Sequence, residues 1–164
     1  MKKRTAGFSL IEIAIVVLVI GILAAIAVPL FQQATRRSLL STLENDLRVM
    51  SQQFLSYELE FGEYPPSELD SGVFPTGMDN RLTRAWLDPC VAGGFYRWNY
   101  TTEDNPLDRA AYIDVVGTPD RPILLGTNEL KKLDHELDNG DETTGKLRVY
   151  GMNIRYYVRL PKGQ

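Results

Sequence analysis

The chain has 164 residues, of which 44% are hydrophobic and 24% are charged, and its formal net charge is −3 at pH 7. This length holds one domain with one appendage. The acidic balance argues against non-specific nucleic-acid binding, which needs clustered Lys and Arg. Cys90 is the only cysteine, which excludes an intrachain disulfide, and we expect it to be a small buried side chain.

A basic start precedes a long apolar segment. Lys2, Lys3 and Arg4 come first, and no charged residue occurs from Ile13 to Phe31. At about 1.5 Å per residue, a helix of this length covers about 28 Å, close to the ~30 Å of a bilayer core. Glu12 stands at the start of this segment, where an ionised side chain costs on the order of 2–3 kcal/mol or more.

Three interpretations of this N-terminus compete. It fits a secretory signal peptide cleaved near Ala25-Ile26-Ala27, a plain membrane anchor, or a basic leader that ends at Gly7 and precedes a retained helix. Glu12 favours the third interpretation. Cleavage after Gly7 would create a cationic amine on Phe8, about one helical turn from the carboxylate, and the amine of a neighbouring copy could serve equally.

The run Gly7-Phe8-Ser9-Leu10-Ile11-Glu12 resembles the class III leader and N-methylphenylalanine helix of type IV pilins and type II secretion pseudopilins. The resemblance implies that prepilin peptidase cuts between Gly7 and Phe8 and methylates the Phe8 amine. It implies that Glu12 neutralises the Phe8 amine of an adjacent subunit during assembly. It also implies that the segment from Gly21 to Pro29 loses helicity in the filament.

The helix continues beyond the apolar segment. Pro29 predicts a kink, because it lacks an N–H donor and clashes with the carbonyl of Ala25. Gly62 and Pro65-Pro66 predict the end of the helix. Apolar residues at alternating spacings of three and four predict one buried stripe; they are Leu40, Leu43, Leu47, Met50, Phe54, Tyr57 and Phe61.

The remainder predicts a small sheet. Residues 62–94 are rich in turn formers, with a short helix expected from Asp79 to Leu87. Strand patterns cover 95–101, 111–116, 122–125 and 147–160, the last broken at Gly151. We therefore predict an α+β fold in which a long N-terminal helix packs on a small antiparallel sheet. The predicted parts are a cleaved leader (1–7), a transmembrane and assembly half-helix (8–31), an amphipathic half-helix (32–61) and a globular domain (62–164).

Acidic residues gather before the last pair of strands, in a segment that we expect to be a loop. Oxygen ligands in a flexible loop suit Ca²⁺, and resemblance to the major pseudopilins implies a calcium site late in the domain. The candidate ligands are Asp134, Asp138, Asp141 and Glu142. The spacing matches no EF-hand, so a solvated acidic turn remains the alternative. His135 lies among these acids without a second His or Cys for zinc.

No catalytic constellation or phosphate-binding glycine loop is found, which predicts a non-enzymatic protein with no small-molecule substrate and no cofactor other than this possible calcium. The resemblance implies a single-pass inner-membrane subunit that polymerises with itself and with minor pilins in a periplasmic or cell-surface filament. Its other partners would be prepilin peptidase and the inner-membrane assembly platform. Resemblance to the type IV major pilins would imply a disulfide in the C-terminal loop of many members, so the absence of a cysteine pair favours a type II secretion pseudopilus. The alternative is a type IV pilus major or minor pilin with an adhesion or DNA-uptake surface, for which the candidates are Arg81, Arg84, Arg97, Arg109 and Arg121.

Overall fold

The computed structural model describes residues 9–101, 109–141 and 143–161. The chain divides between Ser38 and Leu39 into an N-terminal helical unit and a folded domain. Helix α1 (Leu10–Phe61) contributes residues to both units and continues through Pro29 without interruption. It ends as predicted, because Gly62 adopts a left-handed φ of 84° and its N–H donates to the carbonyl of Glu58 at 2.8 Å.

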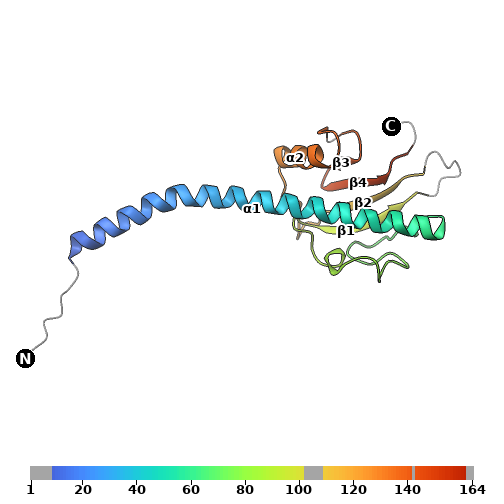
Figure 1. Ribbon diagram of the computed structural model, residues 1–164, viewed down its shortest axis with the longest axis horizontal. Coiled ribbons are helices and arrows are strands. Elements are labelled where there is room, and N and C mark those ends of the chain that lie inside the picture. Colours follow the sequence, from blue (N-terminus) through green and yellow to red (C-terminus); the bar gives the residue numbers. More distant parts are fainter. Residues whose placement is uncertain (1–8, 102–108, 142, 162–164) are drawn as a thin grey trace, which may run out of the picture. The chain divides into compact units, whose positions relative to one another are not determined.

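The folded domain contains one antiparallel four-stranded sheet in the order β1-β2-β4-β3. Its strands are β1 (Phe95–Tyr100), β2 (Ala111–Val116), β3 (Leu147–Tyr150) and β4 (Asn153–Arg159). The C-terminal part of α1 packs across one face of this sheet (Figure 1). The predicted α+β fold is therefore confirmed, and so is the division of the last strand pattern at Gly151.

The core lies between α1 and the sheet. Every second residue of β1 is buried, as the predicted alternation requires. The ring of Phe54 stacks on that of Trp98, with 3.7 Å between centroids. Both buried indole N–H groups reach a main-chain carbonyl, since Trp98 donates to Pro65 at 2.9 Å and Trp86 donates to Val73 at 2.7 Å.

The predicted helical stripe is buried in its middle. Leu43, Leu47, Met50 and Phe54 are buried, and Leu40 and Tyr57 pack against the core in part. The prediction was wrong for Phe61, which is exposed. At this last turn the ring lies under the guanidinium of Arg81, 5.7 Å from its centroid, instead of entering the core.

The segment between α1 and the sheet contains less helix than predicted. Only a 3₁₀ turn, η1 (Arg84–Trp86), forms within the expected helix 79–87. Thr83 is extended, with φ −79° and ψ 166°, so the preceding turn cannot continue into η1. Leu82 and Trp86 are nevertheless buried.

The predicted strand at 122–125 was also wrong. Pro122 has no N–H for a ladder, and the N–H of Leu124 donates instead to the carbonyl of Ala92 at 2.8 Å. The chain passes close to Gly93, where an added Cβ would stand 2.0 Å from the Pro122 carbonyl oxygen. This segment is a loop that leads into α2.

Helix α2 (Thr127–Leu137) occupies part of the predicted acidic loop. The carboxylate of Glu129 accepts a bond from the Gly126 N–H at 2.8 Å, which caps the first turn. Leu130 and Leu133 are buried and Leu137 packs against the core. These three leucines are three and four residues apart, so they form one apolar stripe along the helix.

Candidate processing and assembly site

Glu12 closes the first turn of α1. The N–H of Ser9 donates to Oε2 of Glu12 at 2.9 Å, and the N–H of Ile11 donates to Oγ of Ser9 at 3.3 Å. Ser9 thus caps the helix through the N–H of its second residue, and Glu12 adds the reciprocal bond of a capping box; both satisfy N–H groups that have no partner inside the helix. Sequence reasoning missed it, although Ser-x-x-Glu before an apolar run is its signature. Glu12 therefore has a local structural role besides its predicted pairing.

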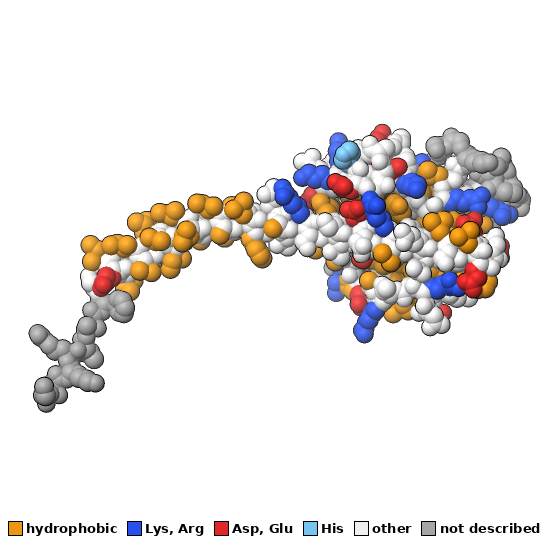
Figure 2. Space-filling model, viewed as in Figure 1, with side chains coloured by type: hydrophobic (Ala, Val, Ile, Leu, Met, Phe, Trp, Pro, Cys, Tyr) orange, Lys and Arg blue, Asp and Glu red, His pale blue; other side chains and the backbone are white. Residues whose placement is uncertain are grey.

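The surface that follows Glu12 is apolar on all sides. The large apolar side chains from Leu10 to Phe31 are between 49% and 92% exposed, and Figure 2 shows them covering this part of α1. A window of α1 reaches a mean hydropathy of 3.1, and none of it is buried. By length and composition, α1 is the one helix among the described residues that could cross a membrane.

The other predicted assembly residues lie within α1. A Cβ added to Gly21 would meet nothing within 4 Å, so no described contact requires glycine at this position. Pro29 lies inside the helix and leaves the carbonyl of Ala25 without its usual donor. The predicted cleavage and methylation residues, Gly7 and Phe8, lie outside the described residues. The roles of these four residues in processing and assembly remain predictions.

The predicted calcium ligands occupy different settings. Asp134 lies in the last turns of α2 and is buried, and neither of its carboxylate oxygens accepts a hydrogen bond within the described residues. Burial, followed by repulsion from Asp138, raises the pKa of Asp134. Asp138 caps the end of α2 and binds the N–H of Lys146 at 2.5 Å. Asp141 is exposed and binds Thr143 within the following turn.

No group of three or more acidic, His or Cys side chains that could hold a metal lies together in the described part of the chain. Glu142 is outside that part. His135 lies in the last turn of α2 and not in a loop. The calcium site therefore stays a prediction, which calorimetric titration with calcium would test.

Several predicted nucleic-acid residues have partners within the domain. Arg81 pairs with Glu60, and Arg84 pairs with Asp88. Arg97 pairs with Asp114 at 3.1 Å. Three of the five candidate arginines therefore lie in separate local ion pairs, and the guanidinium of Arg121 lies 6.0 Å from the ring centroid of Phe95.

Asp114 is a buried acid that sequence reasoning missed. Its side chain is 1% exposed, and it accepts bonds from Nε of Arg155 at 2.8 Å and Nη2 of Arg97 at 3.1 Å. Nδ2 of Asn99 adds a third donor at 3.3 Å. The guanidinium of Arg155 also lies 3.8 Å from the ring centroid of Tyr112. The available signal was an aspartate in the middle of an otherwise apolar strand.

A second polar chain links α1 to β1 inside the domain. The hydroxyl of Tyr96 donates to Oδ2 of Asp46 at 3.2 Å, and Sγ of Cys90 lies 3.4 Å from the same hydroxyl. Cys90 is buried, as predicted, and burial raises its pKa. Burial also raises the pKa of Asp46, and the bond from Tyr96 offsets part of that rise.

Known proteins share the N-terminal motif and part of the sequence of this chain. Residues 2–28 match the family described as "Prokaryotic N-terminal methylation motif". A fimbrial protein of Neisseria meningitidis is 37% identical over 73 residues, which cover 44% of this chain and 43% of the relative. The type II secretion system core protein G of Dickeya chrysanthemi is 29% identical over 73 residues, which cover 44% of this chain and 48% of the relative. The chain thus spans less than half the length of these curated relatives.

The structure of the major type IV pilin PilA1 from Clostridium difficile shares the fold. Its TM-score is 0.55 at 14% identity, over 76% of this chain and 97% of that one. The chain has a pilin-like fold. The relatives of this pilin-like chain include both type IV pilins and type II secretion core proteins, and the two kinds align with a similar share of it.

Proposed function

We propose that the chain is a structural, non-enzymatic subunit that polymerises with copies of itself and with other pilin-like subunits. The observation that carries this proposal is the first part of α1, where one carboxylate at Glu12 precedes an exposed apolar surface extending to Phe31. Such a surface is unfavourable in water. It needs either lipid or other apolar helices around it, which an inner membrane and then a helical filament would supply in turn.

Within this proposal, prepilin peptidase removes residues 1–7 and methylates Phe8, and an inner-membrane assembly platform extracts the subunit. Glu12 already uses Oε2 for its own helix cap. An ionised carboxylate has about four acceptor sites, so the cap leaves room for the Phe8 amine of a neighbouring copy. The same side chain can therefore start its own helix and pair with the next subunit.

We favour a type II secretion pseudopilus because the single cysteine excludes the intrachain disulfide that many type IV major pilins have. The second candidate is a type IV pilus with an adhesion or DNA-uptake surface. The identity with the Neisseria fimbrial protein supports this candidate. A calcium ion held near Asp138 and Asp141 would be compatible with either filament.

Two substitutions at Glu12 separate its two roles. Glu12→Gln keeps an oxygen that can cap the helix, because Glu and Gln both serve in capping boxes, but it removes the charge. Glu12→Ala removes both. Loss of one partner of a buried charge pair costs about 2–5 kcal/mol. We therefore expect both variants to lower the yield of sheared filaments from the native host by about tenfold or more.

Processing is the internal control for this experiment. Intact-mass measurement should show that both variants are cut after Gly7 and methylated on Phe8, as in the wild type. A wild-type mature species that begins at Met1 would contradict the processing step. Normal filament yield from Glu12→Gln, with loss only in Glu12→Ala, would show that the cap matters and that the charge pair does not.

A further inference from the structure

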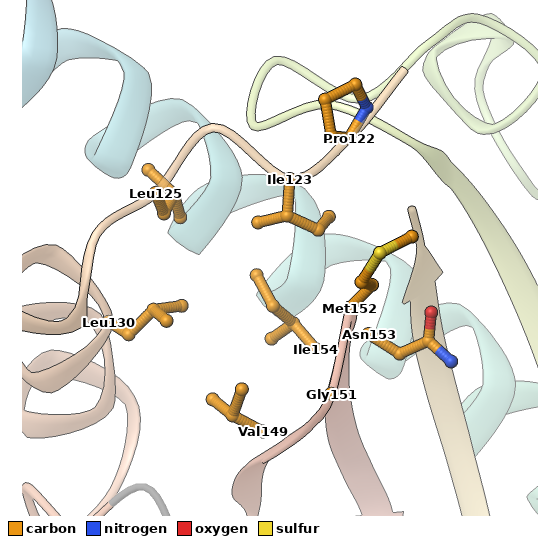
Figure 3. A pocket seen from close by; sticks show the side chains of 9 residues that line it. All are labelled: Pro122, Ile123, Leu125, Leu130, Val149, Gly151, Met152, Asn153 and Ile154. Carbon is orange, nitrogen blue, oxygen red and sulfur yellow. The ribbon is translucent and has the colours of Figure 1, made fainter. Parts of the chain in front are cut away.

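The folded domain contains a small apolar pocket at the end of the β3–β4 hairpin (Figure 3). Its volume is about 280 Å³, just under the range of about 300–1,000 Å³ typical of sites that enclose a drug-sized ligand. Apart from Asn153, the lining is apolar or glycine; it consists of Pro122, Ile123, Leu125, Leu130, Val149, Gly151, Met152, Asn153 and Ile154. A pocket of this size and lining suits one large apolar side chain.

Two large apolar side chains at or beside this pocket are exposed. Met152 is 54% exposed, and Leu124, which lies between two lining residues, is 71% exposed. Two basic residues, Arg121 and Lys131, adjoin lining residues in the chain. One acid, Glu129, also adjoins a lining residue, and it accepts a bond from the Gly126 N–H in the cap of α2. The pocket therefore suits an apolar side chain with acidic neighbours.

Leu69 has these properties. It is 87% exposed, and it stands between Glu68 and Asp70. Neither acid forms a salt bridge within the described ranges, and Glu68 accepts one bond from the Leu69 N–H at 3.1 Å. An equally exposed leucine, Leu59, lacks this feature, because its neighbours Glu58 and Glu60 pair with Arg159 and Arg81.

The loop that carries Leu69 is held in place. The N–H of Glu68 donates to the Trp98 carbonyl at 3.1 Å, and the N–H of Gly72 donates to the Tyr96 carbonyl at 2.7 Å. Oγ of Ser67 donates to the Tyr100 carbonyl at 2.9 Å. These bonds fix the loop along the free edge of β1, so Leu69 projects from a rigid support and its docking would cost little ordering entropy.

Leu69 and the pocket lie at separate places on the domain. The loop runs beside β1, which is one outer strand, whereas the pocket is lined by residues of β3, β4, α2 and the 122–125 segment. Figure 1 shows α2 and β3 on one side of the domain and the segment before β1 on the other. Leu69 therefore cannot occupy the pocket of its own chain. Two complementary patches at separate places on one chain generate an open, head-to-tail assembly.

We propose that Leu69 of one copy docks into the pocket beside Met152 of the next copy, with Glu68 and Asp70 facing Arg121 and Lys131. This inference rests on the proposed filament function and names one contact that would hold neighbouring globular domains together. The contact is heterologous, so each copy offers one Leu69 and one pocket.

Cysteine cross-linking in assembled filaments tests this contact. The full chain with Leu69→Cys and Met152→Cys is expressed in the native host, treated with a mild oxidant, and run on a non-reducing gel. We expect a ladder of dimers, trimers and larger species. Both positions are exposed, so these substitutions leave the core intact, and Cys90 is buried. The matched control pairs Leu59→Cys with Met152→Cys, and neither this pair nor the single variants should give a ladder.

The possible results decide the proposal. A second pair uses Leu124→Cys in place of Met152→Cys. If filaments form but neither Leu69 pair gives a ladder, the contact is overturned and the filament function is left intact. Dimers alone would overturn the head-to-tail arrangement. If the wild type forms no filaments, the proposed function itself fails. A ladder from either Leu69 pair, with none from the Leu59 pair, supports the contact.

Discussion

Asp114 shows how one residue can anchor a sheet face. Replacing it with alanine leaves the guanidiniums of Arg97 and Arg155 without their shared carboxylate. We expect Asp114→Ala to lower the free energy of unfolding by about 3 kcal/mol, the low end of the cost of breaking a buried pair, because both guanidiniums still reach water. Denaturant unfolding of the full chain in detergent, followed by tryptophan fluorescence, measures this loss.

The control for that loss is a surface pair. Asp88→Ala removes the exposed bridge to Arg84, whose atoms are 3.7 Å apart. An exposed pair contributes roughly 0–1 kcal/mol, so this variant should unfold almost like the wild type. Equal losses from the two variants would contradict the special role assigned to the burial of Asp114.

Asp46 predicts a pH dependence of stability. Burial raises its pKa in the folded chain above the ordinary value of 3.8, so the folded state holds its proton to higher pH than the unfolded state does. Stability contributed by this group is therefore greatest below the unfolded pKa and falls as the pH rises through the folded pKa. We expect Asp46→Asn, which keeps an acceptor for the Tyr96 hydroxyl, to raise the Tm at pH 7.

The sign of this effect is checked by repeating the melts at acidic pH. The advantage of Asp46→Asn over the wild type should shrink as the pH falls toward 3.8, because Asp46 itself becomes protonated there. A constant difference between the two proteins across this range would show that the substitution acts through packing and not through the charge.

At the scale of elements, one side chain ties α2 to α1. Nη2 of Arg48 donates to the main-chain oxygen of Glu136 at 2.7 Å, near the end of α2. A cation at this end of a helix is favourable, and the bond supplies a partner for a terminal carbonyl. Because a hydrogen bond from a charged group contributes about 1.5–3 kcal/mol, we expect Arg48→Ala to speed amide exchange in α2 by about tenfold or more.

Glu44→Ala serves as the control for this prediction. Glu44 forms a salt bridge with Arg48 at 3.0 Å but makes no bond to α2 in the contacts described. Its removal should leave amide exchange in α2 close to that of the wild type. Faster exchange in both variants would mean that the charge pair, and not the bond to Glu136, holds α2.

Elements with strong periodicity were predictable from the sequence. The stripe from Leu43 to Phe54 and the alternation in β1 each follow a single buried face, so local pattern and tertiary packing agree. Helix α2 was not predicted because the acids Asp134 and Asp138 masked a short leucine stripe. The segment from Pro122 to Leu125 has a strand-like composition, but its one bond goes to Ala92 outside the sheet.

At the scale of the whole molecule, the N-terminal motif was readable from the sequence. The methylation motif is local, and residues 2–28 match it directly. The pocket beside Met152 was not readable, because its lining comes from a loop, from α2 and from both strands of a hairpin. Only the fold brings such distant residues together. For the same reason, the partners of Asp114 could not be named from β2 alone.

The placement of Leu69 and the pocket at separate places on one domain gives any row of docked copies a direction. One end of the row would present a vacant pocket, and the other would present an undocked leucine. The two ends would therefore differ chemically, and growth at one would not be equivalent to growth at the other. A related subunit with the leucine but without the pocket could join only one end, and it would stop further addition there.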